Sequence, residues 1–177
     1  MTTLIALLRG INIGGNHPLP MKALAALLEE MGLREVRTYI QSGNVVFRCD
    51  GKNKAALAAQ ISAAIKAQHG FEPQVLLLDA AELRKAMAGN PYPEAEADPR
   101  SLSLLFLAEV PPHPDLKTME ALKTDSERFK LVGKVFYLHA PEGVGRSRLA
   151  AQAEKLLGVA ASGRNWKTVC KLAEMIG

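Results

Sequence analysis

The strongest chemical signal in the chain lies between Arg9 and Asn16, where three glycines are interspersed with polar side chains. Glycine permits positive φ angles and leaves backbone N–H groups exposed, and such groups can form an anion-binding nest. An arginine adds a guanidinium fork that suits phosphate or carboxylate. The spacing matches neither the dinucleotide-binding GxGxxG pattern nor the P-loop, and the alternative is a tight strand-to-helix connection stiffened by glycine and proline. The ligand-binding candidates in this segment are Arg9, Asn12, Gly14, Gly15 and Asn16.

A second polar segment, Gln41-Ser42-Gly43-Asn44, has the composition of a hairpin turn between two strands. In a ferredoxin-like unit, the end of the first strand and the tip of the hairpin between the second and third strands lie at the same end of the sheet. This turn and the glycine-rich segment should therefore converge. Two polar loops at one edge predict a pocket for a small anionic ligand, with Gln41, Ser42 and Asn44 as further candidates.

Two helix starts in the second half of the chain carry arginines. Ser147, which follows Arg146, is a preferred N-cap residue. Arg164 and Asn165 are expected to open the final helix. A helix N-terminus beside arginine favours phosphate or carboxylate, so these four residues are also ligand-binding candidates. The alternative is ordinary capping with solvated arginines.

The C-terminal part of the chain is its basic pole. Residues 144–171 carry six basic side chains against one acidic, whereas the whole chain has a net charge of +4 at pH 7. Aromatic residues make up only 5% of the chain, and the RNP1 pattern of RNA-binding sheets is missing. We interpret Trp166 as a core residue rather than a base-stacking platform. The predicted nucleic-acid binding is therefore weak and strongly salt-dependent.

The sequence identifies no catalytic residue. None of the four histidines has a partner at metal-ligand spacing, and neither a GxSxG elbow nor an HExxH motif occurs. We therefore expect no metal and no cofactor, and the sequence leaves open whether any reaction is catalysed.

The expected location is the cytoplasm, without membrane contact. The N-terminal apolar run from Leu4 to Leu8 is too short to span a bilayer and lacks a basic segment before it. Cys49 and Cys170 are widely separated, a spacing more typical of two thiols in a reducing compartment than of a bridge.

The hydrophobic pattern predicts an α+β fold of two tandem ferredoxin-like units with mainly antiparallel sheets. In the first half the order is strand, helix, strand, strand, helix, strand; the second half repeats strand, helix, hairpin, helix. Residues 1–90 form the first predicted unit and residues 100–177 the second, which has an extra C-terminal helix. The stretch between them lacks periodicity. The predicted strands and helices are 3–8, 21–31, 36–40, 45–47, 54–69, 74–78, 79–89, 101–108, 116–119, 129–132, 135–138, 147–157 and 164–176.

The first strand of each unit should be covered on both faces. Leu4 to Leu8 and Leu102 to Leu107 are apolar at nearly every position, whereas a sheet with one solvated face alternates apolar and polar residues. The cover would come from the other half of the chain or from a second subunit in a homodimer.

Four motifs give the chain a family resemblance. It resembles the uncharacterised bacterial family catalogued as domain of unknown function 1697, which implies a cytosolic α+β protein and supplies no catalytic residue. The motifs are the segments 9–15 with 19–21, 38–47, 141–147 and 164–169.

Three functions are consistent with the sequence. The favoured one is binding of a small anionic ligand, nucleotide-like or phosphorylated, by a binding protein or an enzyme. The second is weak nucleic-acid binding by the basic pole, and the third is a structural or assembly module without a ligand. Burial of the sheet faces would argue against RNA binding on the sheets and leave the edge pocket available.

Overall fold

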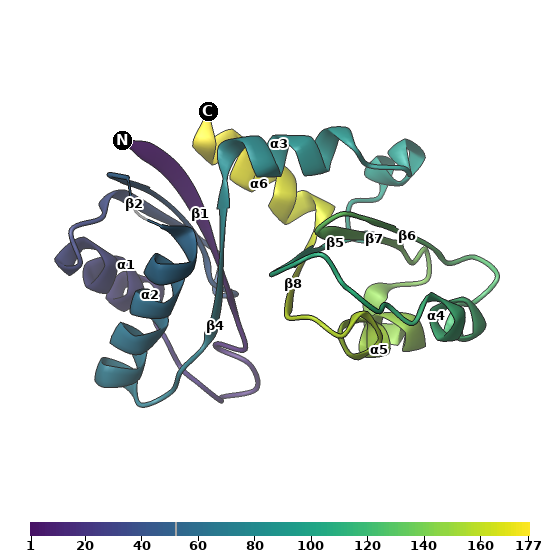
Figure 1. Cartoon of the computed structure of the whole chain (residues 1–177), viewed down its shortest axis with the longest axis horizontal. Coiled ribbons are helices and arrows are strands. Elements are labelled where there is room, and N and C mark those ends of the chain that lie inside the picture. The colour runs from purple at the N-terminus through teal and green to yellow at the C-terminus, as the bar shows by residue number, and fades with distance from the viewer. Residues whose placement is uncertain (52) are drawn as a thin grey trace. The chain divides into compact units, whose positions relative to one another are not determined.

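The computed structural model describes residues 1–51 and 53–177, which contain two four-stranded antiparallel sheets (Figure 1). By their internal contacts the residues divide into two compact units. The first comprises Met1–Arg84 with Leu172–Gly177, and the second comprises Lys85–Lys171. No helix among the described residues has both the length and the apolar character needed to cross a membrane.

The first unit has the strand order β2-β3-β1-β4, in which every neighbouring pair is antiparallel. Its second helix begins after Asn53, whose side chain accepts a hydrogen bond from the backbone N–H of Ala56, and ends at Gly70 with φ 82°. The elements are β1 (Thr2–Arg9), α1 (Met21–Glu30), β2 (Arg34–Tyr39), β3 (Asn44–Cys49), α2 (Lys54–His69) and β4 (Gln74–Asp79).

The second unit repeats this topology with the strand order β6-β7-β5-β8. The prediction of two tandem ferredoxin-like α+β units is therefore confirmed. Its elements are β5 (Leu102–Leu107), α4 (Leu116–Leu122), β6 (Arg128–Val132), β7 (Val135–His139), the 3-10 turn η2 (Val144–Arg146), α5 (Arg148–Leu157) and β8 (Ala161–Asn165).

Strand β8 corrects the prediction for Arg164 and Asn165. Both residues belong to this strand, which pairs with β5, and not to the helix that follows. The sequence Ala-Ser-Gly-Arg-Asn has only one apolar side chain, so it shows no strand alternation; the sheet partner imposes the extended conformation. The side chain of Asn165 still acts at the helix start, because its Oδ1 accepts a hydrogen bond from Thr168 N at 2.9 Å.

Helix α3 (Ala80–Ala88) and helix α6 (Trp166–Ile176) each contribute residues to both units. The division falls between Arg84 and Lys85 in α3. The 3-10 helix η1 (Pro93–Ala97) follows α3 in the chain and belongs to the second unit. The contact division thus falls inside α3, and residues 90–100, where the sequence placed the boundary, lie in the second unit.

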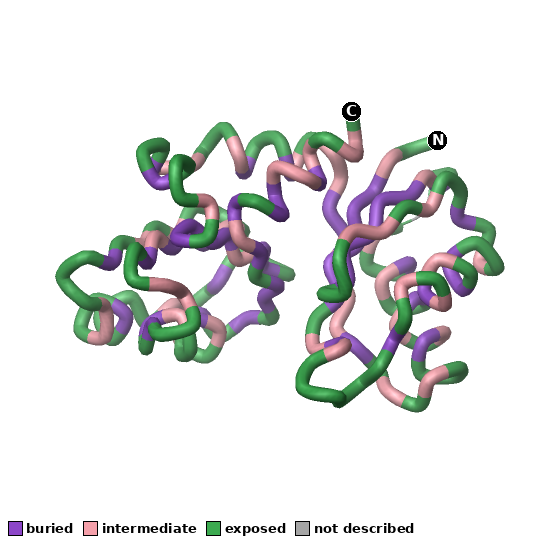
Figure 2. The backbone as a smooth tube through the Cα atoms, turned by 180° about the vertical axis from the view of Figure 1, so that it is seen from behind, coloured by how far each residue is buried: buried purple, intermediate pink, exposed green. Residues whose placement is uncertain are grey.

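Two helices cover one face of each sheet and form its main core. In the first unit this core includes Leu4, Leu8 and Phe47 of the sheet with Leu24 and Ile61 of the helices. Figure 2 shows the resulting run of buried residues along the central strands. The alternation of strand residues then assigns the remaining side chains to the second face of each sheet.

The second faces are also buried. In the second unit, Phe106 and Tyr137 are almost fully buried there, and the Tyr137 hydroxyl donates a hydrogen bond to Ala86 O at 2.6 Å. In the first unit, Ile5 and Leu7 are fully buried. Arg37, which pairs with Val46 on this same face, donates a hydrogen bond to Met175 O near the end of α6. The prediction that both faces of β1 and β5 are buried is therefore confirmed.

Candidate functional site

The predicted glycine-rich site folds as a small hairpin between β1 and α1. The backbone N–H of Ile13 and of Asn16 each donates to the other residue's carbonyl, at 3.2 and 2.8 Å. Gly14 and Gly15 between them have φ angles of 55° and 77°, and two positive φ angles are the requirement of a type I′ turn. The glycines therefore turn the chain and lie exposed at the hairpin tip.

Asn12 ties this hairpin to the neighbouring turn. Its side-chain Nδ2 donates to Leu19 O at 2.9 Å and to Gln41 O at 2.8 Å, while its Oδ1 accepts from Leu19 N at 2.7 Å. The predicted convergence of the two polar segments is confirmed by the contact with Gln41. The amide of Asn12 is engaged with the protein itself, so its role here is to brace the loops.

The turn before β3 packs closely on the end of β1. Leu8 N donates to Gly43 O at 2.8 Å, and a Cβ atom at Gly43 would lie 2.7 Å from the Leu8 Cβ. Only glycine fits this approach, and its φ of 88° also favours glycine. Asn44 is fully buried and donates through Nδ2 to Tyr39 O and to Ser42 Oγ, at 3.1 and 2.9 Å.

His17 and Phe71 belong to the same end of the sheet, and sequence reasoning missed both. The His17 ring lies nearly parallel to Phe71, with 4.6 Å between centroids and 8° between planes. Its Nδ1 is 3.0 Å from Gly10 O, and since a carbonyl only accepts, Nδ1 carries the proton in this contact. Proximity to Asn16 could have pointed to His17; nothing in the sequence singles out Phe71.

Left-handed backbone conformations concentrate in these loops. Asn12, His17 and Ile40 are three of the four non-glycine residues with positive φ in the described part of the chain. Ile40 has φ 48°, which is a costly conformation for a β-branched residue. Such conformations persist where surrounding contacts impose them and are frequent at binding sites. We call residues 9–17 and 40–44 the loop cluster.

The loop cluster presents polar groups to solvent. Arg9, Asn16, Gln41 and Ser42 are exposed, as are the hairpin glycines, whereas Asn12 is half-buried and Asn44 is buried. The residues predicted as one site thus divide into two groups. Asn12 and Asn44 hold the loops together through hydrogen bonds within the protein. The other polar side chains of the predicted site are exposed to solvent.

Ser147 is the N-cap of α5, as predicted. Its Oγ accepts a hydrogen bond from Ala150 N at 3.0 Å, and its side chain is buried. Arg146 precedes it in η2 and is exposed. The buried serine is committed to capping, whereas the neighbouring Arg146 and Arg148 are exposed.

Arg164 does not join these arginines. Ala161 of β8 packs in the core beneath α4 and α5, so strand alternation directs Arg164 to the opposite face of the sheet. There it is only 9% exposed, and burial lowers the pKa of its guanidinium to about 10. Arg164 therefore stays charged at neutral pH, but the predicted basic pole is split between two faces of the second sheet.

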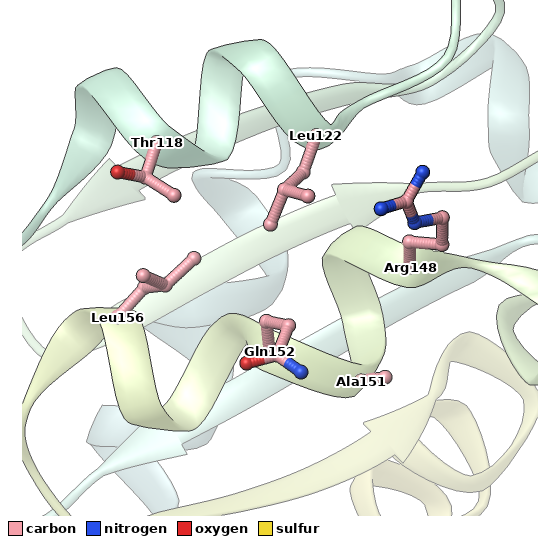
Figure 3. Close-up of a pocket in the computed structure, with 6 residues that line it drawn as sticks. All are labelled: Thr118, Leu122, Arg148, Ala151, Gln152 and Leu156. Carbon is pink, nitrogen blue, oxygen red and sulfur yellow. The ribbon is translucent and has the colours of Figure 1, made fainter.

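A shallow groove of about 320 Å³ runs between α4 and α5 (Figure 3). Leu122 and Leu156 extend into it from the two helices, and the guanidinium of Arg148 lies toward one end. Its remaining lining residues are Thr118, Ala151 and Gln152. Within the described residues, no group of three or more His, Cys, Asp or Glu side chains could hold a metal ion.

The chain matches a protein family over residues 1–137, described as "Protein of unknown function (DUF1697)". Because the match covers most of the chain, the protein belongs to this family. A solved structure, that of conserved bacterial protein SP0830 from Streptococcus pneumoniae, is similar over 99% of both chains, with 26% sequence identity and a TM-score of 0.73. No curated protein matches the chain.

Proposed function

We propose that this DUF1697 protein binds a small anionic ligand, nucleotide-like or phosphorylated, at the loop cluster of its first unit. The observation that carries the proposal is the concentration of left-handed residues in loops that also expose Arg9, Gln41 and Ser42. A costly backbone geometry held by dedicated hydrogen bonds is a common feature of preorganised binding sites.

The donors suit an anion. The guanidinium of Arg9 can form paired hydrogen bonds with a phosphate or carboxylate. Gly14 and Gly15 expose backbone at the hairpin tip without a side chain to block close approach. Ser42 adds a hydroxyl from the adjoining turn, which Asn12 holds in place through Gln41 O.

The proposal assigns distinct tasks to the two groups of residues. Asn12 and Asn44 set the loop geometry through their hydrogen bonds to backbone and to Ser42. Arg9, Asn16, Gln41 and Ser42 contact the ligand. We expect this binding to occur in the cytoplasm, an expectation that rests on the sequence alone.

The proposal predicts that Arg9→Gln weakens anion binding. Isothermal titration calorimetry with ribose 5-phosphate should show at least a tenfold loss of affinity, because a charged hydrogen bond contributes about 1.5–3 kcal/mol. Arg34→Gln is the matched control. Arg34 is also exposed, but it lies opposite Arg48 in the β2–β3 register, toward the other end of the sheet. Equal affinity of the wild type and Arg9→Gln would contradict the assignment.

RNA binding on the sheet surfaces has less support. RNA-binding ferredoxin-like domains stack bases on an exposed sheet face, whereas Ile5, Leu7, Phe106 and Tyr137 are buried here. Nucleic acid could then bind only through its charge, at the exposed arginines near the start of α5.

A further inference from the structure

The His17 ring is a fixed aromatic surface in the loop cluster. One face lies on Phe71, which packs against the main core of the first unit. The ring edge is held by the contact of Nδ1 with Gly10 O at 3.0 Å. The backbone is held as well, since Asn12 N donates to His17 O at 3.0 Å. Despite these contacts, His17 remains exposed.

The ring is anchored next in sequence to Arg9, whose guanidinium the proposed function uses: Gly10, the residue contacted by His17 Nδ1, directly follows Arg9, the last residue of β1. Two apolar side chains on the same loops are also exposed, Ile13 by 63% and Ile40 by 49%. The loop cluster therefore combines a cation, a flat ring and apolar side chains.

We propose that the ligand carries a flat aromatic group and that this group stacks on His17 while its anionic group contacts Arg9. A nucleoside monophosphate is the class of molecule that combines both features. This inference rests on the proposed function for its anionic half. Stacking is favoured because a ring that is already immobilised loses little conformational freedom when a base packs on it.

The competing explanation is that His17 only shields Phe71 from water. In that case the loop cluster would bind a phosphate without regard to what the phosphate is attached to. The two explanations differ in the affinity for a nucleotide compared with a sugar phosphate.

Three probes separate the contributions: adenosine 5′-monophosphate, ribose 5-phosphate and adenosine. We expect the nucleotide to bind roughly tenfold more tightly than ribose 5-phosphate, within the range that base–aromatic stacking provides. In NMR spectra the adenine protons should shift upfield on binding, because they enter the shielding region of the His17 ring.

The variant His17→Asn removes the ring and keeps the backbone conformation, since asparagine tolerates positive φ and its amide can donate to Gly10 O. It should bind the nucleotide and ribose 5-phosphate equally. His113→Asn changes an exposed histidine of the second unit and should leave the tenfold preference intact. A thermal unfolding curve close to that of the wild type confirms that His17→Asn is folded, and Phe71→Leu provides a second variant that disrupts the stack.

The outcomes distinguish this inference from the proposed function. Equal binding of the nucleotide and ribose 5-phosphate by the wild type would overturn the inference and leave anion binding in place. Binding of the nucleotide and adenosine with equal affinity, lost in His17→Asn, would support the stacking but overturn the anionic role of Arg9. No binding of any probe would overturn both.

Discussion

Asn12 shows how a single side chain can organise a site without touching a ligand. Its three hydrogen bonds join the hairpin, Leu19 and the turn at Gln41, and its φ of 53° suits asparagine better than most residues. We predict that Asn12→Ala destabilises the protein by about 2–3 kcal/mol, because Leu19 N loses its acceptor in a buried position. Urea unfolding followed by circular dichroism measures this loss.

The control for Asn12 is Asn16→Ala in the same hairpin. Asn16 contributes backbone hydrogen bonds to the turn, and its side chain is exposed. Its replacement should change the free energy of unfolding by less than about 0.5 kcal/mol. If the two variants were equally stable, Asn12 would not have the bracing role.

A comparison of alanine variants at Gly43 and Gly14 distinguishes the cost of steric contact from the cost of backbone strain. Both have positive φ, but a Cβ at Gly43 would lie 2.7 Å from the Leu8 Cβ, while nothing lies within 4 Å of one at Gly14. Gly14→Ala should cost about 1–2 kcal/mol from the left-handed conformation alone. Gly43→Ala should cost at least about 1 kcal/mol more, because the packing of β1 must also shift.

Thermal denaturation of both glycine variants measures this difference. A Gly43→Ala variant as stable as Gly14→Ala would mean that the turn can move away from β1 without cost. The close approach of Gly43 to Leu8 would then not be needed for the loop geometry.

At the scale of elements, η1 is fastened to the second sheet by a cluster around Arg128 of β6. Its guanidinium pairs with Glu94 of η1, lies 4.5 Å from the centre of the Tyr92 ring and is 3.0 Å from His139 Nδ1. Because Arg128 can only donate, His139 must be neutral to accept. Burial, followed by the charge of Arg128, lowers the pKa of His139 below 6.5, against the opposing effect of Glu94 and Asp98.

This arrangement predicts a loss of stability in mild acid. Since the folded pKa of His139 is below the unfolded value, the folded state binds fewer protons. Its contribution to stability is present above pH 6.5 and is lost as the pH falls through the folded pKa. Urea unfolding between pH 7.5 and 5.5 should show a decrease that His139→Gln reduces and His113→Gln does not. An equal decrease in all three proteins would contradict this role.

Comparison of individual elements shows which sequence signals were sufficient to predict a helix or strand. Helix α2 was predictable at both ends because Asn53 caps it and Gly70 stops it. Strand β8 was not, since its conformation depends on pairing with β5, a contact distant in sequence. In the loop cluster, topology predicted that residues near Asn12 and Gln41 meet. The stacking of His17 on Phe71 is a tertiary contact that residue types and spacing do not encode.

At the scale of the whole molecule, the repeated topology explains the apolar character of β1 and β5. Each is an inner strand with a helix-covered face and a second face that is also buried. The sequence showed that both faces need cover, because neither strand alternates. It could not show that α3 and α6 would contribute residues to both units, since this depends on how the chain packs and not on local periodicity.

Binding of an anion at the loop cluster is the central claim, and an NMR titration tests it most directly. Ribose 5-phosphate is added to the ¹⁵N-labelled protein, and the shifts of the backbone amides are followed. We predict saturable shifts at Gly14, Gly15 and Ser42, with little change at Ala151 and Gln152 in the α4–α5 groove. Shifts confined to that groove, or no saturable shifts in the loop cluster, would contradict the account.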